Sequence, residues 1–120
     1  MYSEVAMVSR FKLTEAEIGD GCREIAVEGE LDLAVSEQLQ QAIDDCPAER
    51  ILISLEFCEF IDSTGLCLII RAHRGGKSRV VAHSPHSQVL RLLELTGLTA
   101  NGLVFPDRNE ALSALVRPGG

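Results

Sequence analysis

The stretch Ile51-Leu52-Ile53-Ser54-Leu55 decides the fold of this chain. It is a short, nearly continuous run of apolar, β-forming residues, which is typical of a strand buried on both faces. Such strands belong to parallel sheets, whose neighbouring strands are joined by crossover helices. The run therefore predicts a central strand of an α/β domain.

The residues before this run predict a hairpin. Residues 11–18 alternate apolar and polar side chains, as a half-exposed strand does, and Gly19-Asp20-Gly21 is a turn signal. A second strand follows over 24–28, and we expect it to close at Gly29. The hairpin makes the N-terminal strand antiparallel to the rest of the sheet.

After Asp32 the period of the apolar residues changes to that of a helix. They recur three or four positions apart, which gives one apolar face: Val35, Leu39, Ala42, Ile43 and Cys46. Pro47 should end this helix, since proline cannot continue it. The first crossover of the sheet is therefore predicted between the second strand and the central run.

The residues after the run continue the alternation. We expect a helix from about Ser63 to Arg74, a strand over 79–82, a helix opened by Ser84-Pro85 and closed by Gly97, a short strand over 103–105 and a last helix holding Ala111, Leu112, Leu115 and Val116. The prediction is one α/β domain spanning 1–120, with its ordered core at about 11–116. Its five-stranded sheet is mostly parallel, with an antiparallel N-terminal strand and about four helices.

Composition narrows the function. The chain has 120 residues, 46% of them hydrophobic, which is enough for one packed core. Eleven Lys and Arg against eighteen Asp and Glu give a net charge of −7, which disfavours direct binding to nucleic acid. The start resembles no secretory signal, and no apolar run approaches the roughly 18 residues that span a bilayer. We expect a cytoplasmic protein whose four cysteines, which form no C-x-x-C pair, are buried thiols.

Chemistry should gather at the carboxyl ends of the parallel strands, where loops lead into helices. Three segments are predicted to meet there: 29–32, 60–65 and 83–86. The middle one places Asp62, Ser63 and Thr64 at a helix start, where such residues ordinarily cap free amides. Gly65 in the first turn costs about 1 kcal/mol of helix propensity relative to Ala. It suggests that something large approaches the backbone there.

Three segments of the sequence, Gly29-Glu30-Leu31-Asp32, Phe60-Ile61-Asp62-Ser63-Thr64-Gly65-Leu66 and Leu92-Leu93-Glu94-Leu95-Thr96-Gly97-Leu98, carry a resemblance to a known family. In this order and spacing the chain resembles the STAS-domain anti-sigma factor antagonists of bacteria, from about residue 11 to 116. Cys67 departs from the pattern, because a glycine commonly follows the leucine.

The resemblance implies a regulatory role in transcription, such as a stress response. It implies that Ser63 is phosphorylated by an anti-sigma factor that is itself a serine kinase, with Asp62 and Asp32 as neighbouring acidic contacts. The unphosphorylated form would bind this partner and release the sigma factor, and a metal-dependent phosphatase would reset the switch. The expected partner surface also includes Glu30, Thr64, Gly65 and His86.

The physics of such a switch follows from the residues. A phosphate adds about −1.5 to −2 charge and is welcome at a helix N-terminus, so the fold should survive its addition. It would instead repel a partner from a surface that is already acidic with Glu30, Asp32 and Asp62.

Other functions remain open from the sequence. The same fold could be an unmodified scaffold or a transporter accessory subunit, or a small-ligand or redox sensor acting through Cys58 and Cys67. His83 and His86 lack a third ligand at a recognisable spacing, so we expect no metal or other cofactor and take them as interface-rim or loop residues. Ser63, Asp62 and His83 lack the surroundings of a hydrolytic triad, so we expect no enzyme activity. Self-association is left open.

Overall fold

The computed structural model describes residues 11–19, 21–75, 78–84, 87–95 and 102–116, and these form six strands and four helices. The chain order is β1 (Phe11–Gly19), β2 (Cys22–Leu31), α2 (Leu33–Asp45), β3 (Arg50–Ser54), β4 (Cys58–Ile61), α3 (Ser63–Gly75), β5 (Arg79–His83), α4 (Ser87–Leu95), β6 (Val104–Phe105) and α5 (Arg108–Val116). The predicted α/β class is confirmed, with the helices close to their expected places.

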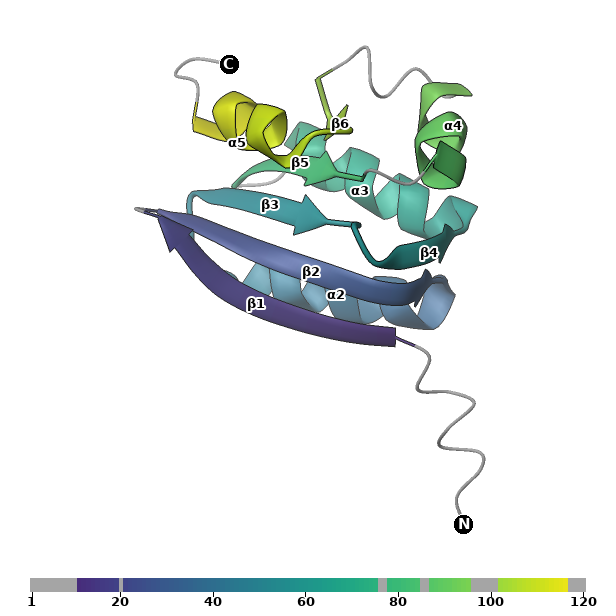
Figure 1. Cartoon of the computed structure of the whole chain (residues 1–120). Coiled ribbons are helices and arrows are strands. Elements are labelled where there is room, and N and C mark those ends of the chain that lie inside the picture. The colour runs from purple at the N-terminus through teal and green to yellow at the C-terminus, as the bar shows by residue number, and fades with distance from the viewer. Residues whose placement is uncertain (1–10, 20, 76–77, 85–86, 96–101, 117–120) are drawn as a thin grey trace.

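The strands form one mixed sheet in the order β1-β2-β3-β5-β6 (Figure 1). β1 is antiparallel to β2, and the other pairs are parallel. The central run is β3, in which Ile51, Leu52 and Ile53 have no exposed surface. The run therefore has the position that its composition predicts.

A sixth strand, β4, extends the expected sheet. It also pairs with β2, beyond the stretch that pairs with β3, so that β3 and β4 follow each other along the same neighbour. The expectation that β2 closes at Gly29 was wrong, because this pairing carries β2 on to Leu31. Gly29 has a positive φ of 91°, and the register shifts between Gly29 and Glu30.

Helices cover both faces of the sheet. α2 and α3 lie side by side on one face and α5 lies on the other (Figure 1). The side chains of β3 alternate between the two layers. Ile51 and Ile53 join the large core cluster under α2 and α3, whereas Leu52 packs with Ala111 and Leu115 of α5. Burying each such aliphatic side chain contributes about 1.5–3 kcal/mol to the stability of the fold. The packing of helices on both faces therefore holds in place the sheet edge that carries the site.

The two C-terminal helices, α4 and α5, pack against strands of the sheet. α4 lies beside β4 (Figure 1) and is described from Ser87. Its expected start at Pro85 and its expected end at Gly97 lie outside the described residues. α5 is tied to β2 by an ion pair in which Arg108 Nη2 donates to Glu24 Oε1 at 2.6 Å.

None of the helices formed by the described residues has both the length and the apolar character needed to cross a membrane.

Candidate functional site

Two aspartates directly follow the ends of two paired strands. Leu31 of β2 and Ile61 of β4 are paired residues of parallel strands, and Asp32 and Asp62 directly follow them. The backbone N–H of Asp62 donates to the carbonyl oxygen of Leu31 at 3.2 Å, which links the two chain segments. Adjacent strands lie about 4.8 Å apart, so the starts of α2 and α3 are held close together.

Each aspartate caps the helix that it precedes. The Asp32 side chain accepts a hydrogen bond from the backbone N–H of Val35 at 3.2 Å. Asp62 Oδ1 accepts one from the N–H of Gly65 at 3.0 Å. The capping interpretation of the sequence is confirmed for Asp62. Both carboxylates are therefore fixed in orientation, and together they place negative charge at this end of the sheet.

Ser63 is the first residue of α3, and its side chain is exposed. Thr64 is half-buried, and Glu30, the second-to-last residue of strand β2, is exposed. The predicted sequence segments 29–32 and 60–65 thus do meet at one edge. A hydroxyl in this position is open to a modifying enzyme, and a group attached to it would sit at the positive end of the α3 dipole.

Gly65 has a packing role inside the chain. It is buried, and a Cβ atom added to it would lie 2.7 Å from Cγ of Leu31 and 3.0 Å from the carbonyl oxygen of Leu31. Real Cβ atoms essentially never lie within 3.0 Å of such a neighbour, so Leu31 would have to shift. The large group that approaches this backbone is thus the end of β2 of the same chain.

Of the two histidines in the third segment, the structure describes His83 alone. His86 lies outside the described residues. His83 is buried at the end of β5, two residues after Val81, whose side chain packs with α5. It is therefore inside the protein rather than on an interface rim. Burial lowers the pKa of the His83 imidazole, and none of the described residues gives its Nδ1 a hydrogen-bond partner.

The cysteines do not form a paired site. Cys22, Cys46 and Cys58 are buried, as expected, whereas Cys67 is exposed on α3. The Cys58 thiol donates to the carbonyl oxygen of Phe60 at 3.2 Å, and burial raises the pKa of this thiol. Cys58 therefore stays protonated and is a poor nucleophile near neutral pH.

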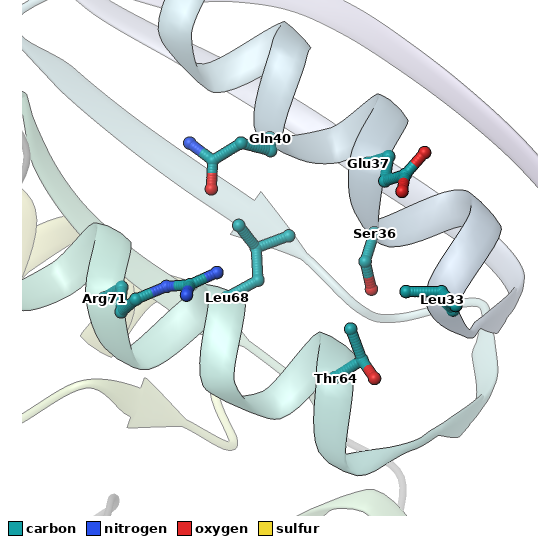
Figure 2. A pocket seen from close by; sticks show the side chains of 7 residues that line it. All are labelled: Leu33, Ser36, Glu37, Gln40, Thr64, Leu68 and Arg71. Atoms are coloured by element: carbon teal, nitrogen blue, oxygen red, sulfur yellow. The ribbon is translucent and has the colours of Figure 1, made fainter.

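A groove between α2 and α3 escaped the sequence analysis. It opens from the two helix starts, has a volume of about 390 Å³, and is lined from α2 by Leu33, Ser36, Glu37 and Gln40 and from α3 by Thr64, Leu68 and Arg71 (Figure 2). Apart from the adjacent pair Ser36 and Glu37, neighbouring lining residues within each helix are three or four apart, so each set lies on one side of its helix. A polar Ser36 within the apolar face of α2 was the available signal.

Comparison with known proteins shows the family of this chain. A family model described as Mlab, STAS domain, matches residues 15–105. An anti-sigma F factor antagonist of Paenibacillus polymyxa is 31% identical over 100 residues, which cover 76% of this chain and 84% of that protein.

Two solved structures are similar in fold. The crystal structure of an anti-sigma factor antagonist from Mycobacterium paratuberculosis has a TM-score of 0.75 and 25% identity, covering 89% of this chain and 95% of that one. The phosphorylated form of the Bacillus cell fate determinant SpoIIAA has a TM-score of 0.63 and 21% identity, covering 85% of this chain and 97% of that one. At that identity, the second match shows the fold alone.

Proposed function

We propose that this chain, which belongs to the STAS-domain family, is an anti-sigma factor antagonist controlled by phosphorylation of Ser63. The observation that carries the proposal is the exposed Ser63 hydroxyl at the start of α3, directly after the capping residue Asp62, in a chain 31% identical to a known antagonist. In its unmodified form the protein would bind the anti-sigma factor and thereby release the sigma factor.

The exposed edge around Ser63 suits a protein partner. Two large apolar side chains at this edge are open to solvent: Leu33, which follows Asp32, is 60% exposed, and Phe60, which precedes Ile61, is 51% exposed. Apolar side chains rimmed by charges are characteristic of interaction surfaces. Glu30 and the two capping aspartates supply that charged rim.

The proposed chemistry is a phosphoryl transfer from ATP. The partner kinase would move the γ-phosphoryl group to Ser63 Oγ, the hydroxyl would lose its proton, and ADP would leave. Ser63 supplies only the acceptor oxygen, so the chain itself needs no catalytic group. Its caps contribute by holding the first turn of α3 in one conformation, since Asp62 accepts from the N–H of Gly65.

One phosphate is enough to separate the partners. Two unit charges 4 Å apart repel by about 4 kcal/mol at an effective dielectric constant of about 20. Half of that value, about 2 kcal/mol, weakens a complex roughly thirtyfold. A metal-dependent protein phosphatase would restore binding, and we propose that the whole cycle runs in the cytoplasm.

The test uses the anti-sigma factor kinases encoded in the same genome, each purified and incubated with the full chain and ATP. Mass spectrometry should find one phosphate, on Ser63, and calorimetry should find that Ser63→Ala binds the same kinase as the unmodified chain does. Ser63→Glu should bind at least tenfold more weakly, whereas Ser113→Glu, an exposed serine of α5, should bind normally.

Two results would contradict the proposal. One is the absence of phosphate on Ser63 after incubation with every such kinase. The other is a stable native complex whose affinity ignores a negative charge at position 63, which would instead favour an unmodified scaffold or transporter accessory subunit.

A further inference from the structure

The groove between α2 and α3 begins at the proposed phosphorylation site. Leu33 and Thr64 line its near end, and each directly follows a site residue, Asp32 and Ser63 respectively (Figure 2). From Thr64 to Arg71 the groove follows two turns of α3, a length of about 10 Å at 1.5 Å per residue. A partner seated on Ser63 would therefore reach the groove without leaving the surface.

The groove wall holds a polar group with unused bonding capacity. Ser36 is 4% exposed, and its Oγ makes no hydrogen bond with any residue that the structure describes. Figure 2 shows this oxygen pointing from α2 into the space beside Thr64. A buried hydroxyl without a hydrogen bond destabilises a fold. A partner group that bonded to Ser36 Oγ would therefore supply the hydrogen bond that the free protein lacks, and this would favour the complex.

The rest of the lining suits a partner segment that carries an apolar side chain and, close to it, an acidic group or a backbone carbonyl. Leu33 is 60% exposed at the near end, and Leu68 forms part of the floor. Arg71 is exposed and reaches over the far end, and no carboxylate in the described part of the chain forms an ion pair with it. The lining also includes the carboxylate of Glu37, which lies beside Ser36 at the near end (Figure 2), so Arg71 at the far end is the position that complements an acidic group.

We infer that this groove is a second docking surface for the anti-sigma factor, which inserts an apolar side chain at the near end, accepts a hydrogen bond from Ser36 Oγ through the backbone carbonyl next to that side chain, and pairs an acidic group with Arg71. The inference rests on the proposed function and extends it. The interface then has two parts: the Ser63 edge, which phosphorylation switches, and the groove, which selects the partner. Arg71 lies about 10 Å along α3 from Thr64, so the ion pair at the far end is set apart from the phosphate, whereas the contact at Ser36 lies next to it.

The test fills the groove without touching Ser63. Gln40→Trp puts a large side chain into the lining, and the matched control is Gln41→Trp, one residue further along α2 on its exposed side. Calorimetry with the purified anti-sigma factor kinase and the unphosphorylated full chain should show binding at least tenfold weaker for Gln40→Trp. Binding of Gln41→Trp should stay within twofold of the wild type.

Two smaller changes test the polar contacts. Ser36→Ala should weaken binding about fivefold while the thermal unfolding midpoint stays the same or rises, because it deletes an unpaired buried hydroxyl. Arg71→Glu should weaken binding at least tenfold. Its control is Lys12→Glu, which changes an exposed cation on the opposite sheet face from Phe11 and Leu13 and should have little effect.

The outcomes separate the two proposals. If folded Gln40→Trp and Arg71→Glu bind as tightly as the wild type while Ser63→Glu does not, the groove inference is overturned and the proposed function stands. If Ser63→Glu also binds normally, the proposed function fails, and the groove inference fails with it. A change in the oligomeric state of Gln40→Trp alone, seen by sedimentation, would assign the groove to a second copy and overturn the inference.

Discussion

Gly65 of α3 and Leu31 of β2 are in such close contact that a single added methyl group would have to overlap the Leu31 side chain. The ideal Cβ position on Gly65 lies 2.7 Å from Leu31 Cγ and 3.0 Å from the Leu31 carbonyl oxygen. Leu31 is fully buried, and the N–H of Asp62 bonds to the same carbonyl. The contact therefore fixes the distance between the end of β2 and the first turn of α3, which presents Ser63.

Gly65→Ala should destabilise the protein. Although alanine favours helix by about 1 kcal/mol, the overlap with Leu31 should cost more, giving a net loss of about 1–3 kcal/mol in the free energy of unfolding. Urea unfolding measures this directly. The matched control is Gly75→Ala at the end of the same helix, where an added Cβ meets nothing within 4 Å, and the expected change is a gain of about 0.4–1 kcal/mol. Equal effects of the two substitutions would refute the packing argument.

The capping bond of Asp62 predicts that two substitutions of this residue differ in their effect on stability. Asp62→Ala removes the acceptor for the N–H of Gly65 and should lower the free energy of unfolding by about 1 kcal/mol. Asp62→Asn keeps an acceptor oxygen and should leave stability nearly unchanged, while removing one negative charge next to Ser63. Equilibrium unfolding of both variants checks the cap. Asp44→Ala, on the exposed side of α2, is the control and should change stability by less than about 0.5 kcal/mol.

Most of the fold could be predicted because the apolar pattern has a clear period in each element. Ile51 to Ile53 predicted the buried strand, and the spacing from Val35 to Ile43 predicted α2. β4 escaped because it is four residues long and two of them are exposed. Its pairing also needs the register shift at Gly29, which depends on the path of a second strand rather than on any local pattern.

Some features of the site could likewise be predicted from the sequence, and others could not. The helix start at Asp62-Ser63-Thr64-Gly65 could be predicted, since capping depends on residues close in sequence. The reason for Gly65 could not, because Leu31 lies far away in sequence and meets it only in the folded protein. The groove depends on how α2 and α3 are spaced on the sheet, so Ser36 and Arg71 gave no sequence signal strong enough to place them together.

His83 predicts a specific loss of stability in mild acid. Burial lowers the pKa of its imidazole, so the unfolded chain binds the proton more readily than the folded chain does. Stability should therefore be fully present at pH values above the ordinary value of 6.5 and should fall as the pH drops below it. Urea unfolding between pH 8 and about 5.5 measures the slope, and His83→Asn should flatten it. An unchanged slope in that variant would assign the effect to other groups.

Phosphorylation of Ser63 should leave the fold intact. The phosphate would sit at the N-terminus of α3, where the helix dipole and unpaired amides favour an anion, and this gain opposes repulsion by Asp62 and Asp32. We expect the free energy of unfolding of the phosphorylated chain to differ from that of the unmodified chain by no more than about 1 kcal/mol, and the difference to shrink at high ionic strength. Urea unfolding of the enzymatically phosphorylated chain, with Ser63→Ala treated in parallel, measures it. A larger destabilisation would mean that loss of partner binding arises from unfolding of the site, rather than from charge on a surface that stays folded.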